Sequence, residues 1–239
     1  MTEFRWYRTP AVIALLDKIR AVEAGNAGYN ADFRNDDRWT LTNKTFNEVR
    51  SLARRQLAQG EPSSAIAGYQ FLAGTLDFLQ TKLELSGNEI MDPFFQDELA
   101  VALMVIKHGF MKLARGEIGS SAFGNNLSRE WASFPVLYDQ KGAHRFVRRG
   151  ETYYAGDKLN KALVSPTTVE ALLTPLSVEL KKAYQAHVNK PDKPTKPEPP
   201  IEEPVEEEPP LDTKTGCVPM LFIFVVVVSA GAASFALFS

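Results

Sequence analysis

The sequence predicts a mostly helical α+β domain over residues 1–190, followed by a disordered linker rich in proline and glutamate over 191–217 and one transmembrane helix over 218–239. Three observations lead to this prediction. Apolar residues recur at helical spacing in the first part, eight of the 15 prolines lie between residues 191 and 215, and no charged residue follows residue 217.

The first predicted helix begins at Thr9-Pro10, because threonine is a favourable N-cap and proline is favourable at the first helical position. Gly25 ends it. The apolar residues on one side of this helix are Val12, Ile13, Leu15, Leu16, Ile19 and Val22. Further helices are expected over about 45–59, 72–85, 93–109 and 168–187. In the helix over 93–109, the residues expected in the core are Phe94, Phe95, Leu99, Leu103 and Ile106.

Strand signals are sparse in the first part of the chain. Residues 34–41 or 145–154 are expected to form a short hairpin. Only a small β component is therefore predicted.

The two C-terminal parts differ from the first in composition. The linker interleaves proline with charged residues and has almost no apolar residue, which favours extended polyproline II, up to about 75 Å long at about 3.1 Å per residue. Residues 218–239 would span roughly 30 Å as a helix, which matches a bilayer core. A buried core element fits this segment poorly, because the linker separates it from any domain. The orientation of the span stays open, and Cys217 beside it is either acylated or an inert cysteine.

Charge and cysteine content exclude several classes of protein. The chain has 27 basic and 29 acidic residues, for a formal charge of −2, so we expect no nucleic-acid partner. One cysteine and three dispersed histidines predict no disulfide framework, no metal site and no cofactor. The N-terminus lacks the apolar run of a secretory signal peptide. The oligomeric state stays open.

Glu23 ends the first predicted helix and is followed at once by a turn rich in glycine and asparagine. The C-terminal end of a helix carries partial negative charge, which disfavours ionisation of a nearby carboxylate and raises its pKa. A general acid that protonates a glycosidic oxygen near neutral pH needs such a shift. From this stretch alone, Glu23 is either such an acid or an ordinary solvated glutamate at a helix end.

A second stretch, residues 63–72, combines small residues with an aromatic ring and an amide. Ser63, Ser64 and a nearby glycine let the backbone come close to a ligand, while Tyr69 offers a flat apolar face and Gln70 an amide. Sugar recognition uses both features. Two further blocks follow, Gln96-Asp97-Glu98-Leu99-Ala100-Val101-Ala102-Leu103 and Glu130-Trp131-Ala132-Ser133-Phe134-Pro135.

In this order and spacing, the four blocks resemble the lambda-type phage endolysins, a family of lysozyme-like muramidases and lytic transglycosylases. That family has a leading helix ending in Glu-Gly, an Asn-Gly-Tyr turn and the segment Ser-Ser-Ala-Gly-Arg-Tyr-Gln-Phe. A Gln-Asp-x-x-Ala-Leu helix and a Trp-Ala-Ser-Leu-Pro segment come later. The resemblance covers about Ala11 to Leu163. It implies a lysozyme-like domain and bacterial peptidoglycan as the partner.

The resemblance also implies roles for individual residues. Glu23 falls on the single catalytic glutamate, and Trp131 on a tryptophan that we interpret as a core anchor rather than a direct sugar contact. The residues that fall on the substrate-binding cleft are Ser63, Ser64, Tyr69 and Gln70. There are two departures: Ala24 replaces a glycine after the glutamate, and the family's arginine before the tyrosine is missing. Tyr154 and its neighbours are expected on the far wall of the cleft.

Most glycosidases need two carboxylates, one on each side of the bond. The nearest candidates, Asp32, Asp36 and Asp37, are expected in a solvated loop. A single glutamate fits a lytic transglycosylase, in which the muramic acid's own 6-hydroxyl replaces water. The hydrolytic muramidase remains the other possible outcome.

The predicted function is therefore cleavage of peptidoglycan glycan strands by an enzyme anchored in a membrane, either the host inner membrane or a virion membrane, during host lysis or genome entry. The lipid bilayer is the second predicted partner, and the linker would raise the enzyme's effective concentration near the wall. Two alternatives belong to other classes. One is a non-catalytic peptidoglycan-binding or structural virion protein with the same fold, and the other is a tail-anchored adaptor whose helical domain binds another protein.

Overall fold

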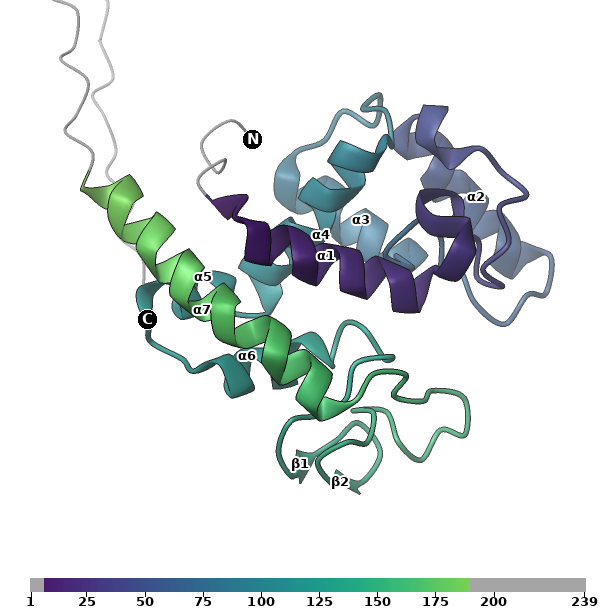
Figure 1. Ribbon diagram of the computed structural model, residues 1–239. Helices are drawn as coiled ribbons and strands as arrows, with labels where there is room; N and C mark the ends of the chain where they lie inside the picture. Colours follow the sequence, from purple (N-terminus) through teal and green to yellow (C-terminus); the bar gives the residue numbers. More distant parts are fainter. Residues whose placement is uncertain (1–6, 190–239) are drawn as a thin grey trace, which may run out of the picture. The chain divides into compact units, whose positions relative to one another are not determined.

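Seven α-helices, two 3-10 helices and one two-stranded hairpin make up residues 7–189, the part of the chain that the computed structural model describes (Figure 1). In the first half these are α1 (Pro10–Glu23), η2 (Gly25–Asn30), η3 (Leu41–Asn43), α2 (Phe46–Ala58) and α3 (Ala73–Leu83). In the second half they are α4 (Pro93–Lys107), α5 (Phe110–Arg115), α6 (Ser120–Leu127), β1 (Gln140–Lys141), β2 (Phe146–Val147) and α7 (Pro166–Val188). The predicted mostly helical α+β fold is confirmed for these residues.

Side-chain caps determine where the long helices begin. Thr9 accepts a hydrogen bond from the backbone N–H of Val12 at 3.3 Å, and Pro10 follows it as predicted. Asp92 and Ser165 cap α4 and α7 in the same way, each followed by a proline. Such caps satisfy backbone donors that a helix start leaves without partners. The helices therefore begin where their sequences offer both a capping oxygen and a favourable first residue.

Helix α1 lies between two groups of elements (Figure 1). On one side it contacts η2, which in turn contacts η3, and α2 and α3, which contact each other, lie on this side in Figure 1. On the other side α1 contacts α7, which also contacts α5 and α6. The buried leucines and isoleucine of the central helices form one continuous core: Leu15, Leu16, Ile19, Leu99, Leu103, Leu173, Leu176 and Leu180. This arrangement fixes the C-terminal end of α1 between the two groups.

Two core predictions for α4 are wrong. Phe94 and Ile106 are 48% and 41% exposed, whereas the other three expected core residues of this helix are buried. The apolar residues of α4 extend around more than the face that the core covers. The ring of Phe94 lies instead beneath the guanidinium of Arg8, with 4.5 Å from Arg8 Cζ to the ring centroid.

The hairpin differs from both predicted positions. β1 pairs with β2 in an antiparallel register, Gln140 with Val147, so only the second strand falls within the predicted range 145–154. Residues 34–40 form a turn, bends and irregular backbone rather than a strand, and Leu41 begins η3. The physical reason is the side chain of Asp32, which accepts hydrogen bonds from the backbone N–H groups of Arg34 at 2.7 Å and Asp36 at 3.1 Å. Donors held by a local side chain are not available to a neighbouring strand.

The predicted linker over 191–217 and the predicted transmembrane helix over 218–239 lie outside the described residues. Within residues 7–189, no helix combines the length and apolar character that crossing a bilayer requires.

Candidate active site

Glu23 is the last residue of α1, at the point where the chain turns into η2. The buried Ala24 donates its backbone N–H to the carbonyl of Arg20 at 2.9 Å, and Gly25 then adopts a φ of 54°. A residue with positive φ at this place ends the helix, and glycine adopts it without steric cost. Because Ile19 is fully buried one turn earlier, the end of α1 is anchored in the core and the half-buried Glu23 side chain is held in place.

The carboxylate of Glu23 meets Ser133, which lies 110 positions later in the chain. The Ser133 hydroxyl donates to Glu23 Oε1, and the Ser133 backbone N–H donates to the same oxygen at 3.4 Å. Burial raises the pKa of Glu23, while the two hydrogen bonds from Ser133 lower it; burial is the larger effect, so the pKa lies above its usual value. Glu23 therefore keeps its proton to a higher pH than an exposed glutamate, as a general acid requires.

Asp32 does not lie in a solvated loop, and that expectation is wrong for this residue. Its side chain is fully buried, its Oδ2 pairs with Arg38 Nε at 2.5 Å, and its Oδ1 holds the two backbone donors described above. Asp36 and Asp37 are exposed, as expected. The carboxylate of Asp32 is thus occupied in holding the turn after η2.

The four residues expected to bind substrate lie on one tight turn and the segment before it. Backbone hydrogen bonds of 3.1 and 2.9 Å join Ile66 and Phe71, so residues 66–71 form a closed turn. Gln70 has a φ of 49°, and its side-chain amide donates to the carbonyl of Asp32 at 3.0 Å. Ser64 accepts from the backbone N–H of Ala73 at 3.0 Å, at the start of α3, and Ser63 accepts from Ala65 at 3.1 Å. The two serines stabilise the local backbone.

The side chain of Tyr69 is only 1% exposed and points into the protein. Its hydroxyl donates to Asp97 Oδ1 at 2.6 Å, and Tyr29 donates to the same oxygen at 2.9 Å. The guanidinium of Arg20, on α1, donates to the Tyr29 hydroxyl at 2.6 Å and lies 3.7 Å from Asp97. Burial raises the pKa of both tyrosines, and the nearby Asp97 adds to the rise. This network ties the turn to α1 and α4, so the ring of Tyr69 serves the fold.

Gly68 belongs to the same network because nothing larger fits beside it. A Cβ added there would lie 3.1 Å from both Arg20 Cδ and Tyr29 Cδ1, tighter than ordinary van der Waals contact. The glycine expected from the sequence to allow a close approach therefore brings the backbone against the protein's own side chains.

Gln96 holds three segments together from a fully buried position on α4. Its Oε1 accepts from the Gly68 N–H at 2.9 Å, and its Nε2 donates to the carbonyls of Tyr29 at 3.1 Å and Met91 at 2.7 Å. It satisfies a donor of the 66–71 turn and an acceptor of η2, the segment that follows Glu23. No role for Gln96 follows from the sequence alone, where the only signal is a polar residue among the apolar residues of a predicted helix.

Comparison with known proteins gives one result. The family model described as Endolysin matches residues 13–155. The chain belongs to the endolysin family. The match covers Glu23, the 66–71 turn, Gln96 and Ser133, and membership implies a phage peptidoglycan-degrading enzyme. No curated protein and no solved structure matches the chain.

Trp131 occupies the core of this endolysin, as expected. It is 2% exposed, and its indole Nε1 donates to the carbonyl of Tyr69 at 3.3 Å. Because Ser133 follows two residues later, the same short segment contacts both the 66–71 turn and the carboxylate of Glu23. The sequence alone does not predict this link between Glu23 and the expected substrate-binding turn.

A polar cavity of about 170 Å³ lies where these elements meet, and we call it the Glu130 cavity. Its walls come from the 66–71 turn, the start of α3, the end of α4 and the segment around Trp131. The lining residues are Tyr69, Gln70, Phe71, Leu72, Thr75, Leu103, Lys107, Arg129, Glu130, Trp131 and Tyr154. Two residues expected in the cleft, Tyr69 and Gln70, therefore reach this cavity together with Tyr154, which was expected on the far wall.

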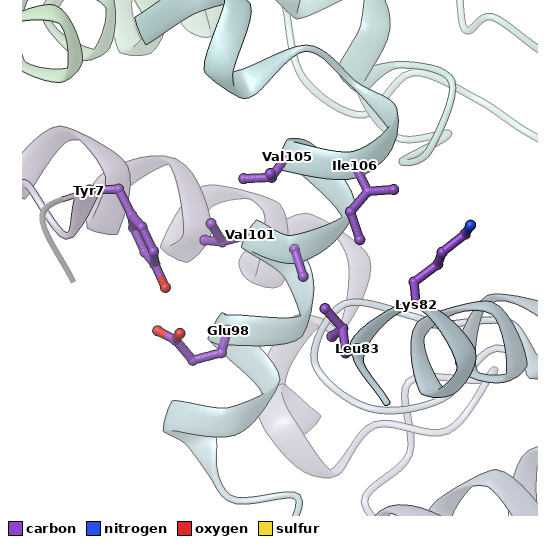
Figure 2. A pocket seen from close by; sticks show the side chains of 8 residues that line it. Tyr7, Lys82, Leu83, Glu98, Val101, Val105 and Ile106 are labelled. Atoms are coloured by element: carbon purple, nitrogen blue, oxygen red, sulfur yellow. The ribbon is translucent and has the colours of Figure 1, made fainter. Parts of the chain in front are cut away.

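A second cavity of this endolysin, about 350 Å³, lies between α3 and α4 (Figure 2). Ile106 of α4 lies toward Leu83, whereas Val101 and Val105 lie on the side of Tyr7, whose hydroxyl points toward Glu98. Burial and the carboxylate of Glu98 raise the pKa of Tyr7. Glu23, Ser133 and the 66–71 turn contribute nothing to this cavity's lining, which separates it from the candidate active site.

Among residues 7–189, no group of three or more histidine, cysteine, aspartate or glutamate side chains is arranged to hold a metal ion.

Proposed function

We propose that this endolysin cleaves the glycosidic bond between N-acetylmuramic acid and N-acetylglucosamine, with Glu23 as general acid and then general base. The observation that carries the proposal is the contact between Glu23 and Ser133, which holds a half-buried carboxylate with a raised pKa at the end of α1. Among the ion pairs of residues 7–189, none neutralises Glu23. A carboxylate in such a position favours the protonated form that acid catalysis needs.

The reaction fits a lytic transglycosylase. Protonated Glu23 gives its proton to the glycosidic oxygen as the bond to C1 of the muramic acid breaks, and the N-acetylglucosamine hydroxyl leaves. The resulting Glu23 carboxylate then takes the proton from the 6-hydroxyl of the same muramic acid, and that oxygen bonds to C1. The product is a 1,6-anhydro sugar, no water is consumed, and Glu23 is protonated again. One carboxylate is sufficient for both steps.

Ser133 has a positioning role in this scheme. Its hydroxyl fixes the orientation of Glu23 and stabilises the carboxylate that exists between the two proton transfers. The 66–71 turn supports substrate through its backbone and Gln70, since the Tyr69 ring is buried. Gln96 holds this turn and η2 at a fixed spacing and so keeps the cleft in shape.

The test compares three versions of the full chain, purified in mild detergent, on isolated peptidoglycan sacculi. These are wild type, Glu23→Gln and Glu84→Gln; Glu84 is an exposed glutamate after α3 and serves as the matched control. Mass analysis of the released fragments distinguishes anhydro from reducing muramic ends. We expect anhydro products from wild type and Glu84→Gln, and loss of at least a thousandfold in rate for Glu23→Gln, because the amide has no proton of suitable acidity to give.

The products decide among the remaining mechanisms. Reducing ends in place of anhydro ends would replace the transglycosylase by a hydrolase with a second carboxylate. Full activity in Glu23→Gln would refute the assignment of Glu23. Binding to sacculi with no fragment released by wild type would favour the non-catalytic peptidoglycan-binding protein.

Membrane anchoring is a second part of the proposal, and it rests on the uncharged residues 218–239. We propose a single span in the host inner membrane or a virion membrane, with the catalytic domain facing the peptidoglycan. Flotation of the full chain with lipid vesicles tests it against the double variant Val226→Arg and Val228→Arg. Arginine near the centre of a span costs about 2.5–3.5 kcal/mol per residue, so the double variant should remain with the unbound protein. Equal flotation of both proteins would refute the span.

A further inference from the structure

The Glu130 cavity contains three charged side chains, and their arrangement leaves one positive charge in excess. Glu130 accepts hydrogen bonds of 2.7 Å from Lys107 Nζ and from His108 Nε2. These two contacts hold the pKa of Glu130 below its usual value, although burial opposes them. The single negative charge of the lining is thus occupied by Lys107, and Arg129 has no counterpart in the lining.

Arg129 is exposed at the edge of this cavity and its backbone is held in place. Tyr154 donates its hydroxyl to the Arg129 carbonyl at 2.6 Å, and the guanidinium lies 5.3 Å from the ring centroid of Tyr153. No carboxylate among residues 7–189 forms an ion pair with Arg129. Arginine is the side chain best suited to a carboxylate, because its planar donors match both carboxylate oxygens.

A short segment of chain, residues 131–133, connects the lining of the cavity to the residue that binds Glu23. Trp131 lines the cavity and Ser133 binds Glu23, so their Cα atoms lie at most about 7 Å apart in a chain that advances at most 3.6 Å per residue. Tyr69 and Gln70, from the 66–71 turn, also line this cavity. The cavity and the contact to Glu23 therefore share the short segment 131–133.

We propose that the Glu130 cavity is a subsite for the peptide stem of peptidoglycan, in which Arg129 binds a stem carboxylate. The inference rests on the proposed function, because it takes a glycan bound at Glu23 as its starting point. The glycan strand itself offers no free carboxylate where a stem is attached, since the lactyl group of the muramic acid is then used in the amide bond. The negative charges of the substrate lie on the stem, and a cavity whose arginine has no ion pair within residues 7–189 fits that part.

A binding experiment tests this independently of catalysis. The probe is N-acetylmuramyl tripeptide with free carboxylates, compared with the same compound after amidation of its carboxylates; neither contains the glycosidic bond to be cut. Titration calorimetry on the full chain in mild detergent compares wild type, Arg129→Gln, Arg129→Lys and Arg55→Gln. Arg55 is an exposed arginine on α2 without an ion pair in the described part of the chain, and it provides the matched control.

We expect wild type and Arg55→Gln to bind the acidic probe about threefold to tenfold more tightly than the amidated one. Arg129→Gln should lose this preference, and Arg129→Lys should keep part of it because the charge remains while the two-pronged geometry is lost. Equal affinity of wild type for both probes, or no binding of either, would overturn the subsite. An unchanged preference in Arg129→Gln would overturn the role of this residue.

Cleavage assays distinguish a failure of the stem-peptide subsite from a failure of the proposed function. On sacculi and on sacculi whose stem carboxylates have been amidated, Arg129→Gln should lose at least threefold more rate on the unmodified wall than on the amidated one. Equal losses on both would overturn the subsite while leaving the cleavage reaction intact. If wild type cleaved neither substrate yet still preferred the acidic probe, the proposed function would fail and the carboxylate site would stand.

Discussion

Replacing Ser133 by alanine should shift the pH dependence of cleavage toward alkaline pH. Both hydrogen bonds from Ser133 stabilise the ionised form of Glu23 and so lower its pKa against the larger effect of burial. Without the hydroxyl, the pKa of Glu23 rises further. A general acid acts only while it is protonated, so activity is lost as pH rises through this pKa. The alkaline limb of the pH–activity profile therefore moves to higher pH.

The size of the shift follows from the one bond removed. A hydrogen bond to a charged group contributes about 1.5–3 kcal/mol, and one pKa unit corresponds to 1.36 kcal/mol. Glu23 is half-buried and keeps the N–H of Ser133 at 3.4 Å, so water and the backbone replace part of that contribution. We therefore expect the alkaline limb to move to higher pH, by less than the loss of the full hydrogen bond would give.

The assay measures kcat/KM on a soluble glycan oligomer from pH 4 to pH 9. Ser128→Ala is the matched control, because Ser128 is also buried and donates its hydroxyl to the carbonyl of Asn125 at 2.9 Å, with no contact to Glu23. The control should lose comparable stability without moving the alkaline limb. An unmoved limb in Ser133→Ala, or a shift to lower pH, would refute the account of the Glu23 pKa.

Three further predictions concern stability. Gln96→Leu leaves three backbone groups without partners and should lower the free energy of unfolding by about 2–4 kcal/mol, measured by urea denaturation. Gly124→Ala should cost about 1–3 kcal/mol in the same measurement, because its Cβ would lie 2.4 and 2.8 Å from two leucine side chains. Gly74→Ala, within α3 and with open space around it, should be neutral or slightly stabilising. Glu23→Gln should stabilise the fold at pH 8 but not at pH 4. The raised pKa makes ionisation costlier in the folded than in the unfolded chain, so the penalty appears as pH rises above the unfolded value near 4.5 and vanishes below it.

Four of the five predicted helices have a side-chain cap at their start, and only α3 among them lacks one. Thr9-Pro10, Thr45 and Pro93 each mark a helix whose first residue the structure places within a few positions of the prediction. Helices α5 and α6 were not predicted, and neither has a side-chain cap at its start. The sequence of α6, Ser-Ser-Ala-Phe-Gly-Asn-Asn-Leu, is intrinsically unfavourable for a helix, and packing of Gly124 against α7 stabilises it instead.

In the candidate site, too, the sequence predicts the features that depend on local signals and not those that depend on distant contacts. The position of Glu23 at a helix end was readable, because cap and turn signals lie within a few residues of it. Its partner Ser133 was not, since nothing local indicates which of many serines lies against a residue 110 positions away. The burial of Asp32 was missed for a related reason: its partner Arg38 is close in sequence, yet the pattern Asn-Asp-Asp-Arg around it is typical of a solvated loop.

The pairing of Glu23 with Ser133 reconciles two requirements of the proposed reaction. A carboxylic acid whose pKa is raised by burial alone gives up its proton reluctantly, and it leaves an unstable anion when the glycosidic bond breaks. A fully solvated carboxylate is ionised at neutral pH and has no proton to give. Half-burial with two donors from Ser133 lies between these limits, because burial keeps the acid protonated and the donors stabilise the anion once the proton has left. The same carboxylate is then placed to act first as acid and next as base.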